Sequence, residues 1–307
     1  MRILVVGAGA VGGYFGGRLL AAGRDVTFLV RPKRAAELGS RGLSVRSKLG
    51  DLDLASPRTI TADVLREPFD VVLLSCKAYD LDSAMESFAP AVGPATVILP
   101  VLNGMRHLDA LDARFGVARV LGGLVLISSA LDAEGRIQHF NDLHVVTFGE
   151  RDGASSERAN RIVAEWSDCG FEVRLTETIL QEMWEKWIFI ATMASATCLM
   201  RAATGDIVAA GGTEVSTRLL DECAAIAADN GFPPREASIE RSRGICIAPD
   251  QFLMASMLRD IERGGHTEGE HMLGDLLNRR KGSDAHLLEI GWLHVKAYEA
   301  RRARESR

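Results

Sequence analysis

The sequence predicts an α/β domain with a doubly wound, mostly parallel sheet over residues 1–176, followed by an all-helical domain over residues 177–307. Three observations lead to this prediction. Short apolar runs alternate with helical patterns in the first half, which is typical of strands covered on both faces by helices. A glycine-rich turn directly follows the first apolar run. After about Ile179 only the periodicity of helices recurs.

The individual elements follow from apolar runs that are bounded by turn residues. In the first half we expect strands at 3–6, 26–30, 70–75, 95–101, 120–129, 143–148 and 171–175, and helices at 14–22, 81–92 and 157–169. The stretch 42–54 alternates apolar and polar residues and predicts an edge hairpin. In the second half we expect helices at 180–200, 214–230, 250–263, 267–280 and 291–304.

The glycine-rich turn has the order G-x-G-x-x-G and lies between a predicted strand and a predicted helix. That context makes the motif specific for a dinucleotide, whereas a purely structural glycine turn is the less favoured alternative. Gly7 permits the tight turn, Gly9 lets the backbone approach a pyrophosphate, and Gly12 lets the helix pack close to the strand. Ala10 and Val11 complete the turn, so that the helix N-terminus faces the anion.

The end of the second strand indicates which dinucleotide is bound. An NAD site usually has an Asp or Glu there, but this chain has Arg31, followed by Lys33 and Arg34. A guanidinium binds a 2′-phosphate with two charge-assisted hydrogen bonds, and a carboxylate would repel that phosphate. NADP is therefore favoured over NAD. The alternative is that these residues are ordinary surface cations.

Two more polar residues follow predicted strands. Lys77 comes after the strand 70–75, and Asn103 comes after the strand 95–101. Ligands of doubly wound sheets collect at the carboxyl ends of strands, where the glycine turn and Arg31 are also expected. This convergence predicts a cofactor site that includes Lys77 and Asn103.

Composition argues against several other classes of protein. A net charge of −5 and a pI near 5.9 give no broad basic surface, which makes nucleic acid an unexpected partner. The longest apolar segment, 187–200, is too short to cross a bilayer, and no secretory leader pattern is present. The five cysteines form no C-x-x-C pair, and the seven histidines show no metal-ligand spacing. We therefore expect a cytoplasmic protein with reduced thiols and no metal site.

Two charged residues of the helical half are candidates for chemistry. Lys186 lies near the start of the most apolar predicted helix, where burial would lower its pKa and suit it to act as a general acid. The alternative is a lysine that only snorkels at a helix end. Thr267 and Glu270 fit a capping box, which would place Glu268 at the first helical position. The helix dipole favours an ionised carboxylate there, although the residues alone favour a Glu268 that only decorates the helix N-terminus.

Six segments, taken in order and at their spacing, resemble the ketopantoate reductase (2-dehydropantoate 2-reductase) family over nearly the whole chain. They are GAGAVGGYFGGRL near the N-terminus, Arg31, SCKAYD around Lys77, VLNGM around Asn103, WEK at 184–186, and ASMLRDIERGGHTEGEHM at 255–272.

The resemblance implies roles for these residues. Arg31 would bind the 2′-phosphate of NADPH, and Lys77 and Asn103 would line the crevice for nicotinamide and substrate. Lys186 would donate a proton to the substrate oxygen, with Glu268 as its essential partner. Ser256 would hydrogen-bond the substrate.

The implied reaction is the reduction of 2-dehydropantoate to pantoate, which serves pantothenate and coenzyme A biosynthesis, and a homodimer is one possible assembly. Ile190, Ala194 and Leu253 stand where the family has asparagines, which indicates a more apolar pocket. Ser195 and Thr197 are the candidates for replacing the lost amides. The alternatives are a reductase of another 2-oxo acid or of an opine-type imine, and a non-catalytic NADPH-binding regulator.

Overall fold

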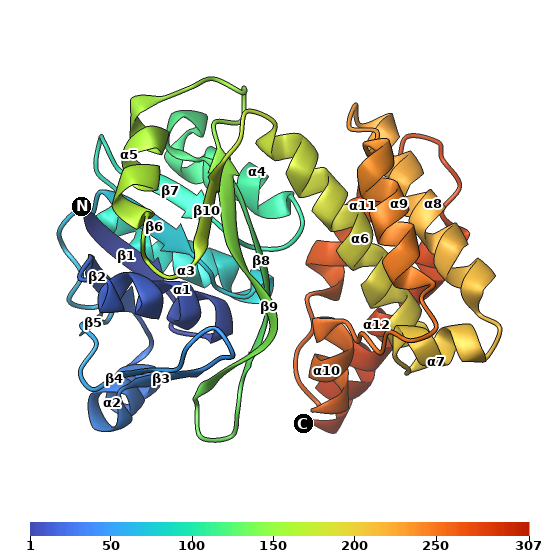
Figure 1. Ribbon diagram of the computed structural model, residues 1–307, viewed down its shortest axis with the longest axis horizontal. Coiled ribbons are helices and arrows are strands. Elements are labelled where there is room, and N and C mark those ends of the chain that lie inside the picture. Colours follow the sequence, from blue (N-terminus) through green and yellow to red (C-terminus); the bar gives the residue numbers. More distant parts are fainter. Residues whose placement is uncertain (307) are drawn as a thin grey trace. The chain divides into compact units, whose positions relative to one another are not determined.

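The computed structural model describes residues 1–306, which form two compact units (Figure 1). Unit 1 consists of Met1–Leu102 and His107–Leu180, and unit 2 consists of Asn103–Arg106 and the chain from Gln181 onward. Within the described residues, every strand lies in unit 1 and unit 2 contains only helices and turns. The predicted fold class is therefore confirmed.

The first sheet of unit 1 is entirely parallel. Its order is β5 (Thr59–Ile60), β2 (Asp25–Leu29), β1 (Arg2–Val6), β6 (Val71–Leu74) and β7 (Val97–Pro100). The residues of β6 and β7 are all buried, as expected for continuous apolar runs covered on both faces. The predicted strands here are confirmed to within two residues at each end.

The second sheet contains β10 (Glu172–Leu175), β9 (Ile137–Gly149), β3 (Leu43–Arg46) and β4 (Leu52–Leu54), with β8 (Gly122–Leu131) paired to β9. The predicted 42–54 hairpin forms, but in this sheet. The prediction that the strands after residue 120 continue one parallel sheet is wrong. A short turn joins β8 to β9, and only antiparallel strands can be connected in that way.

The helices of unit 1 are α1 (Ala10–Ala21), α2 (Pro32–Arg41), α3 (Leu81–Phe88), α4 (Arg106–Phe115), whose first residue belongs to unit 2, and α5 (Glu157–Trp166). Short 3₁₀ turns occur at Ala78–Asp80, Ala89–Ala91 and Val117–Arg119. Helix α1 contacts strands of both sheets. It fits there because it is rich in glycine: a Cβ at Gly13 would lie 2.6 Å from Ile137, and one at Gly16 would lie 2.6 Å from Phe28.

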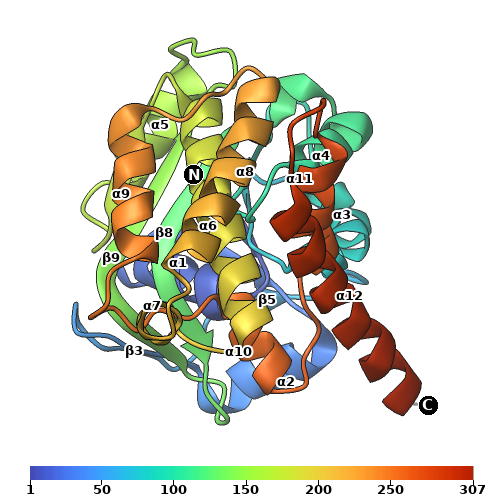
Figure 2. The same cartoon turned by 90° about the vertical axis from the view of Figure 1, so that its right-hand side faces the viewer.

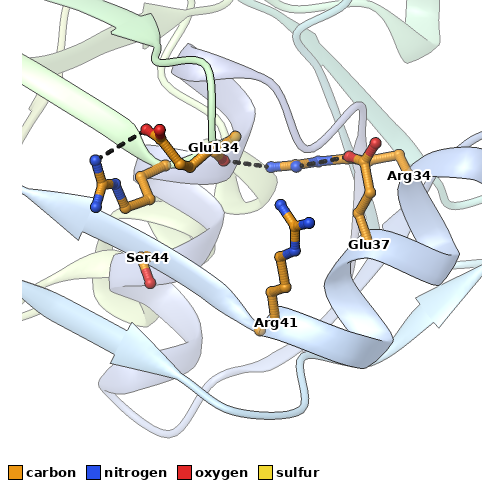
Figure 3. Close-up of a pocket in the computed structure, with 8 residues that line it drawn as sticks. Arg34, Glu37, Arg41, Ser44 and Glu134 are labelled. Atoms are coloured by element: carbon orange, nitrogen blue, oxygen red, sulfur yellow. Dashed lines mark hydrogen bonds and ion pairs between the residues drawn. The ribbon is translucent and has the colours of Figure 1, made fainter.

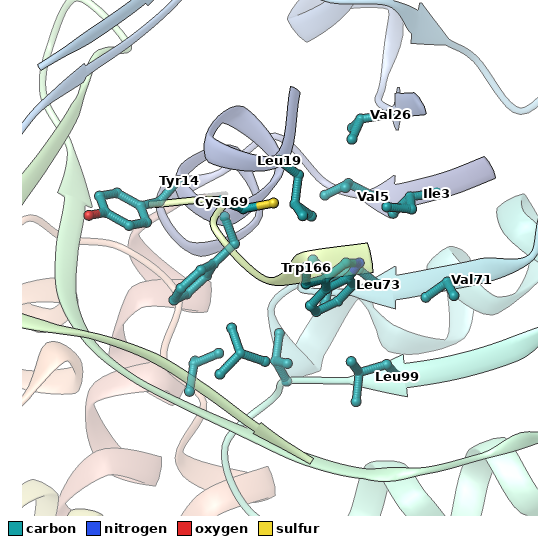
Figure 4. Close-up of a cluster of buried hydrophobic side chains, with 14 of the residues drawn as sticks. Ile3, Val5, Tyr14, Leu19, Val26, Val71, Leu73, Leu99, Trp166 and Cys169 are labelled. Atoms are coloured by element: carbon teal, nitrogen blue, oxygen red, sulfur yellow. The ribbon is translucent and has the colours of Figure 1, made fainter. Parts of the chain in front are cut away.

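The core of unit 1 gathers side chains from β1, α1, β6, β7 and α5 (Figure 4). Tyr14, Leu19 and Trp166 are fully buried in it. The ring of Trp166 lies edge-on to Phe148, at 6.0 Å between centroids. This packing fixes α1 against the sheet, and with it the glycine turn that precedes α1.

Unit 2 is built around the apolar helix α6 (Ile179–Met200), whose first two residues lie in unit 1. The other helices are α7 (Thr204–Ala209), α8 (Thr213–Asp229), α9 (Glu236–Cys246), α10 (Ser256–Glu262), the π-turn η4 (Glu270–Gly274), α11 (Asp275–Asn278) and α12 (His286–Glu305). Helix α8 packs against α9 and α12 (Figure 2). Among residues 1–306, no helix combines the length and the apolar character that crossing a membrane requires.

The predicted helix 250–263 is shorter than expected, because its first residues pair with α7 instead. The backbone N–H of Gly205 donates to the carbonyl of Gln251 at 2.7 Å, and that of Thr204 donates to the carbonyl of Leu253 at 3.0 Å. These bonds hold the segment before Ser256 in an extended form.

Candidate active site

The turn after β1 has the geometry that its glycines predict. Gly7 adopts a φ of +95°, which residues with a Cβ rarely adopt, and its N–H donates to the carbonyl of Leu29 at 3.0 Å. A Cβ on Gly12 would lie only 2.1 Å from Oγ of Ser75. The neighbouring strand therefore approaches the helix as closely as a residue without a side chain allows.

The first turn of α1 offers uncapped N–H groups to an anion. The N-cap residue is Gly9, which has no side chain to cap the helix, and no acidic residue occurs in the first turn. A Cβ on Gly9 would meet nothing within 4 Å, so the space over the helix end is open. Ala10 and Val11 are the first two residues of α1. These features fit the pyrophosphate of a dinucleotide.

Arg31 lies immediately before α2, at the carboxyl end of β2, and its side chain is 72% exposed. Its Nη2 lies 2.5 Å from Oδ1 of Asp80, and this contact raises the pKa of the Arg31 guanidinium. Lys77 is the residue before the 3₁₀ turn that follows β6, so it also lies at the carboxyl end of its strand. Sequence reasoning did not single out Asp80, although it belongs to the SCKAYD segment.

Arg34 has a different role from Arg31. Its Nε donates to the carbonyl of Ala8 at 3.2 Å, and its Nη1 lies 3.1 Å from Glu37. Arg34 therefore supports the glycine turn through the carbonyl of Ala8, and its positive charge is paired with Glu37.

In unit 2, Lys186 and Glu268 interact electrostatically. Burial lowers the pKa of the Lys186 ammonium to about 8, and the negative charge of Glu268 opposes that effect. Lys186 is on the second turn of α6, and Glu268 lies just before the π-turn. An ammonium in this state remains mostly protonated at neutral pH and releases its proton readily.

The segment around Glu268 differs from the predicted capping box. The N–H of Thr267 donates to Glu299 at 2.6 Å, and Glu270 accepts a hydrogen bond from Nε1 of Trp292 at 3.1 Å. The capping-box prediction is therefore wrong, because residues of α12 bind the Thr267 N–H and the Glu270 carboxylate, and the Thr267 hydroxyl accepts the N–H of Gly269 at 3.4 Å. The carbonyl of Glu268 instead accepts the N–H of Met272 at 2.8 Å.

Two contacts connect the π-turn to other candidate residues. Nε1 of Trp187, the residue after Lys186, donates to the buried carbonyl of Met272 at 2.9 Å. His271 hydrogen-bonds the backbone of Asn103, and burial lowers its pKa while Glu268 opposes this effect. Lys186, Glu268 and Asn103 are thus brought into one neighbourhood of unit 2. Sequence reasoning missed His271 and Trp187, whose roles depend on these contacts.

The predicted substrate residues are more scattered. Ser256 is exposed at the first position of α10. Ile190 is partly buried, Ala194 is buried, and Leu253 is 43% exposed. The role of Ser256 at the substrate stays a prediction.

The expectation that Ser195 and Thr197 replace the family's amides stays a prediction. Both side chains are fully buried. Oγ of Ser195 would lie 3.0 Å from a Cβ on Gly291, and Oγ1 of Thr197 donates back to the carbonyl of Met193 at 2.7 Å. The hydroxyl of Thr197 is therefore bonded to the backbone of its own helix, whereas the buried Oγ of Ser195 has no hydrogen-bond partner among residues 1–306.

A small pocket in unit 1 includes Arg34, which contacts the glycine turn through the carbonyl of Ala8 (Figure 3). It is lined by Arg34, Glu37, Arg41, Gly42, Ser44, Glu134, Gly135 and Arg136. Across residues 1–306, no three His, Cys, Asp or Glu side chains are grouped as ligands of a metal ion. All five cysteines are free thiols, and four of them are buried.

Comparison with known proteins gives a consistent result over the whole chain. A family model described as ketopantoate reductase PanE/ApbA matches residues 3–153, and one for the C-terminal part of the same family matches residues 178–299. The uncharacterized oxidoreductase YkpB of Bacillus subtilis is 39% identical over 303 residues, which cover 98% of this chain and 99% of the relative.

Two further proteins carry a more specific description. A 2-dehydropantoate 2-reductase of Mesorhizobium japonicum is 28% identical over 286 residues, which cover 86% of both chains. The crystal structure of 2-dehydropantoate 2-reductase from Geobacter metallireducens has a TM-score of 0.87 at 25% identity, and the match covers 97% of this chain and 99% of that one.

Proposed function

Because the chain belongs to the ketopantoate reductase family, we propose that it reduces a 2-oxo acid to a 2-hydroxy acid, with Lys186 as the proton donor. The chain is an oxidoreductase acting on a CH–OH group, and NADPH is the cofactor of the family, as the sequence predicted. The observation that carries the proposed role is the pKa of Lys186, which burial lowers to about 8 beside Glu268.

The residues of unit 1 fit the cofactor. We propose that the N–H groups after Gly9 bind the pyrophosphate, since no side chain caps them and the space over them is open. Arg31 would bind the 2′-phosphate, and Lys77 would line the nicotinamide end. NADPH, when bound, supplies the hydride.

Lys186 would act on the substrate oxygen. During reduction of a carbonyl that oxygen gains negative charge, so a cation that gives up a proton stabilises the transition state. The ammonium of Lys186 transfers a proton to this oxygen, so that an N–H bond breaks and an O–H bond forms. The lysine is left as a neutral amine, which then takes up a proton from solvent. Glu268 favours the charged form of the lysine, so that the proton is present at neutral pH.

The carboxylate of a 2-oxo acid needs hydrogen-bond donors, and we propose Lys77, Asn103 and Ser256 for this role. The contact of Asn103 with His271 supports the assignment of Asn103, because His271 also interacts electrostatically with Glu268. For Lys77 and Ser256 the support is their position in the family's segments.

Family membership favours 2-dehydropantoate as the substrate, and thus pantoate production for pantothenate and coenzyme A in the cytoplasm. A specific observation favours a second candidate, a 2-oxo acid with a less polar side chain. Three family amides are replaced by Ile190, Ala194 and Leu253, and the hydroxyl of Thr197 is bonded to the backbone of its own helix. Each buried hydrogen bond lost to a hydroxylated substrate costs about 1 kcal/mol.

A substrate panel tests the proposal. NADPH absorbance is followed with 2-dehydropantoate, with branched and aromatic 2-oxo acids, and with an imine formed from an amino acid and a 2-oxo acid. We expect turnover of at least one 2-oxo acid, and its loss in Lys186→Ala with NADPH binding retained. NADPH binding without turnover of any compound would favour the regulator instead. Rescue of a pantoate-requiring strain tests the pathway, and light scattering tests the proposed homodimer.

A further inference from the structure

We propose that Asp80 sets the cofactor preference of this site by competing with the 2′-phosphate of NADPH for Arg31. The inference rests on the proposed cofactor role of Arg31, and it concerns a residue that the family resemblance assigned no role. Its consequence is that the site binds NADH as well, with less discrimination between the two cofactors than Arg31 alone would give.

The two side chains come from strands that flank β1. Arg31 follows β2, and Asp80 follows β6, so both lie at the carboxyl end of the parallel sheet. Nη2 of Arg31 lies 2.5 Å from Oδ1 of Asp80, and the side chains are 72% and 31% exposed. The Arg31 guanidinium is thus accessible to a ligand, while one of its donors already has an anionic partner.

Asp80 is held in place by its backbone. Its N–H donates to the carbonyl of Lys77 at 2.9 Å, and its carbonyl accepts the hydroxyl of Ser83 at 3.0 Å. Asp80 is also the N-cap residue of α3, yet within the described chain its carboxylate makes no capping hydrogen bond to that helix. Its carboxylate is therefore directed to Arg31, and replacing it removes no cap from α3.

The two cofactors respond differently to a carboxylate at this position. The 2′-phosphate of NADPH carries almost two negative charges near neutral pH, whereas the 2′-hydroxyl of NADH is neutral and can donate a hydrogen bond to a carboxylate. NADPH must therefore share Arg31 with Asp80 or displace it. Two negative charges held about 6 Å from a carboxylate in a water-like dielectric weaken binding roughly tenfold.

The test is direct binding of NADPH and NADH, followed by nicotinamide fluorescence, so that no substrate is needed. Asp80→Asn is expected to tighten NADPH roughly tenfold and to leave NADH unchanged or slightly weaker. Asp82→Asn is the matched control, because Asp82 is an exposed acid two residues further on in the same helix. It should change the ratio of the two affinities by less than twofold.

Several outcomes would overturn the inference. If Asp80→Asn weakens NADPH, Asp80 positions Arg31 for the phosphate and does not compete with it. If the ratio is unchanged, or changes equally in Asp82→Asn, Asp80 has no specific role. A wild-type protein that binds neither cofactor would refute this inference and the proposed function together. A protein that binds both without turning over any substrate would refute the proposed reaction alone.

Discussion

Replacing Lys186 with methionine is expected to stabilise unit 2 while abolishing turnover. Burial lowers the pKa of Lys186 from 10.5 to about 8, which means that folding disfavours its charged form. At about 1.4 kcal/mol per pKa unit, this difference corresponds to a cost of about 3 kcal/mol at neutral pH. Methionine has a similar length and carries no charge. Because it leaves Glu268 without the lysine, we expect a net gain of about 1–2 kcal/mol.

The pH dependence of the free energy of unfolding shows whether burial disfavours the charged form of Lys186. The pKa of Lys186 is lower in the folded protein than in the unfolded chain, so the unfolded chain binds more protons between about pH 8 and pH 10.5. Stability of the wild type relative to Lys186→Met therefore rises with pH through that window. Between pH 7 and pH 9.5 the advantage of the variant should shrink by about 2 kcal/mol.

Urea titrations followed by tryptophan fluorescence at these two pH values provide the measurement. Three of the four tryptophans, Trp184, Trp187 and Trp292, lie in unit 2 and report its unfolding. Lys281→Met serves as the control, because Lys281 is an exposed lysine of the same unit. A Lys186→Met variant that is less stable than the wild type at pH 7, or whose advantage does not depend on pH, would refute the claim that burial destabilises the ammonium.

Three further predictions concern activity and cofactor binding. The rate of reduction should fall above about pH 8 as Lys186 loses its proton. In Glu268→Gln this fall should begin at lower pH, because Glu268 raises the pKa of Lys186. Steady-state pH profiles measure the shift, and identical profiles would show that the two residues do not interact. Arg31→Ala should weaken NADPH at least tenfold more than NADH in fluorescence titrations, and equal weakening would remove Arg31 from the phosphate site. Gly12→Ala should abolish dinucleotide binding because its Cβ would lie 2.1 Å from a neighbouring hydroxyl, whereas Gly39→Ala, whose Cβ meets nothing within 4 Å, should bind normally.

The first sheet could be predicted from the sequence because each strand is a continuous apolar run that ends at a turn residue. Strand β9 was predicted only from residue 143 onward, because residues 138–142 of the observed strand are mostly polar and partly exposed. The turn between β8 and β9 contains no helix, and that fact could have identified an antiparallel pair. The sequence predicted that helix α1 begins at residue 14, four residues after its observed start, because the glycines of its first turn have a low helix propensity.

The sequence predicted those site residues that can be recognised from the residues around them in the same segment. The glycine turn and Arg31 are recognised from their spacing to a strand, and Lys186 from its charge in an apolar helix. Asp80 and His271 were missed because each acts on a residue that is distant in the sequence: Asp80 contacts Arg31, and His271 contacts the Asn103 backbone. Local spacing contains no information about such pairs.

The π-turn explains how a destabilising lysine is kept in place. Nε1 of Trp187 donates to the buried carbonyl of Met272, and Glu268 closes the same turn through the N–H of Met272. Both bonds are neutral, and the bond of Trp187 is buried, so they tie the residue after Lys186 to the turn that carries Glu268 without relying on the attraction between the two charges. The attraction between Lys186 and Glu268 then raises the pKa of Lys186 and is not needed to hold the fold together. The π-turn has one residue more per turn than an α-helix, a geometry that is frequent at functional sites. In this segment backbone hydrogen bonds provide the structure, and the side chain of Glu268 provides the charge that acts on Lys186.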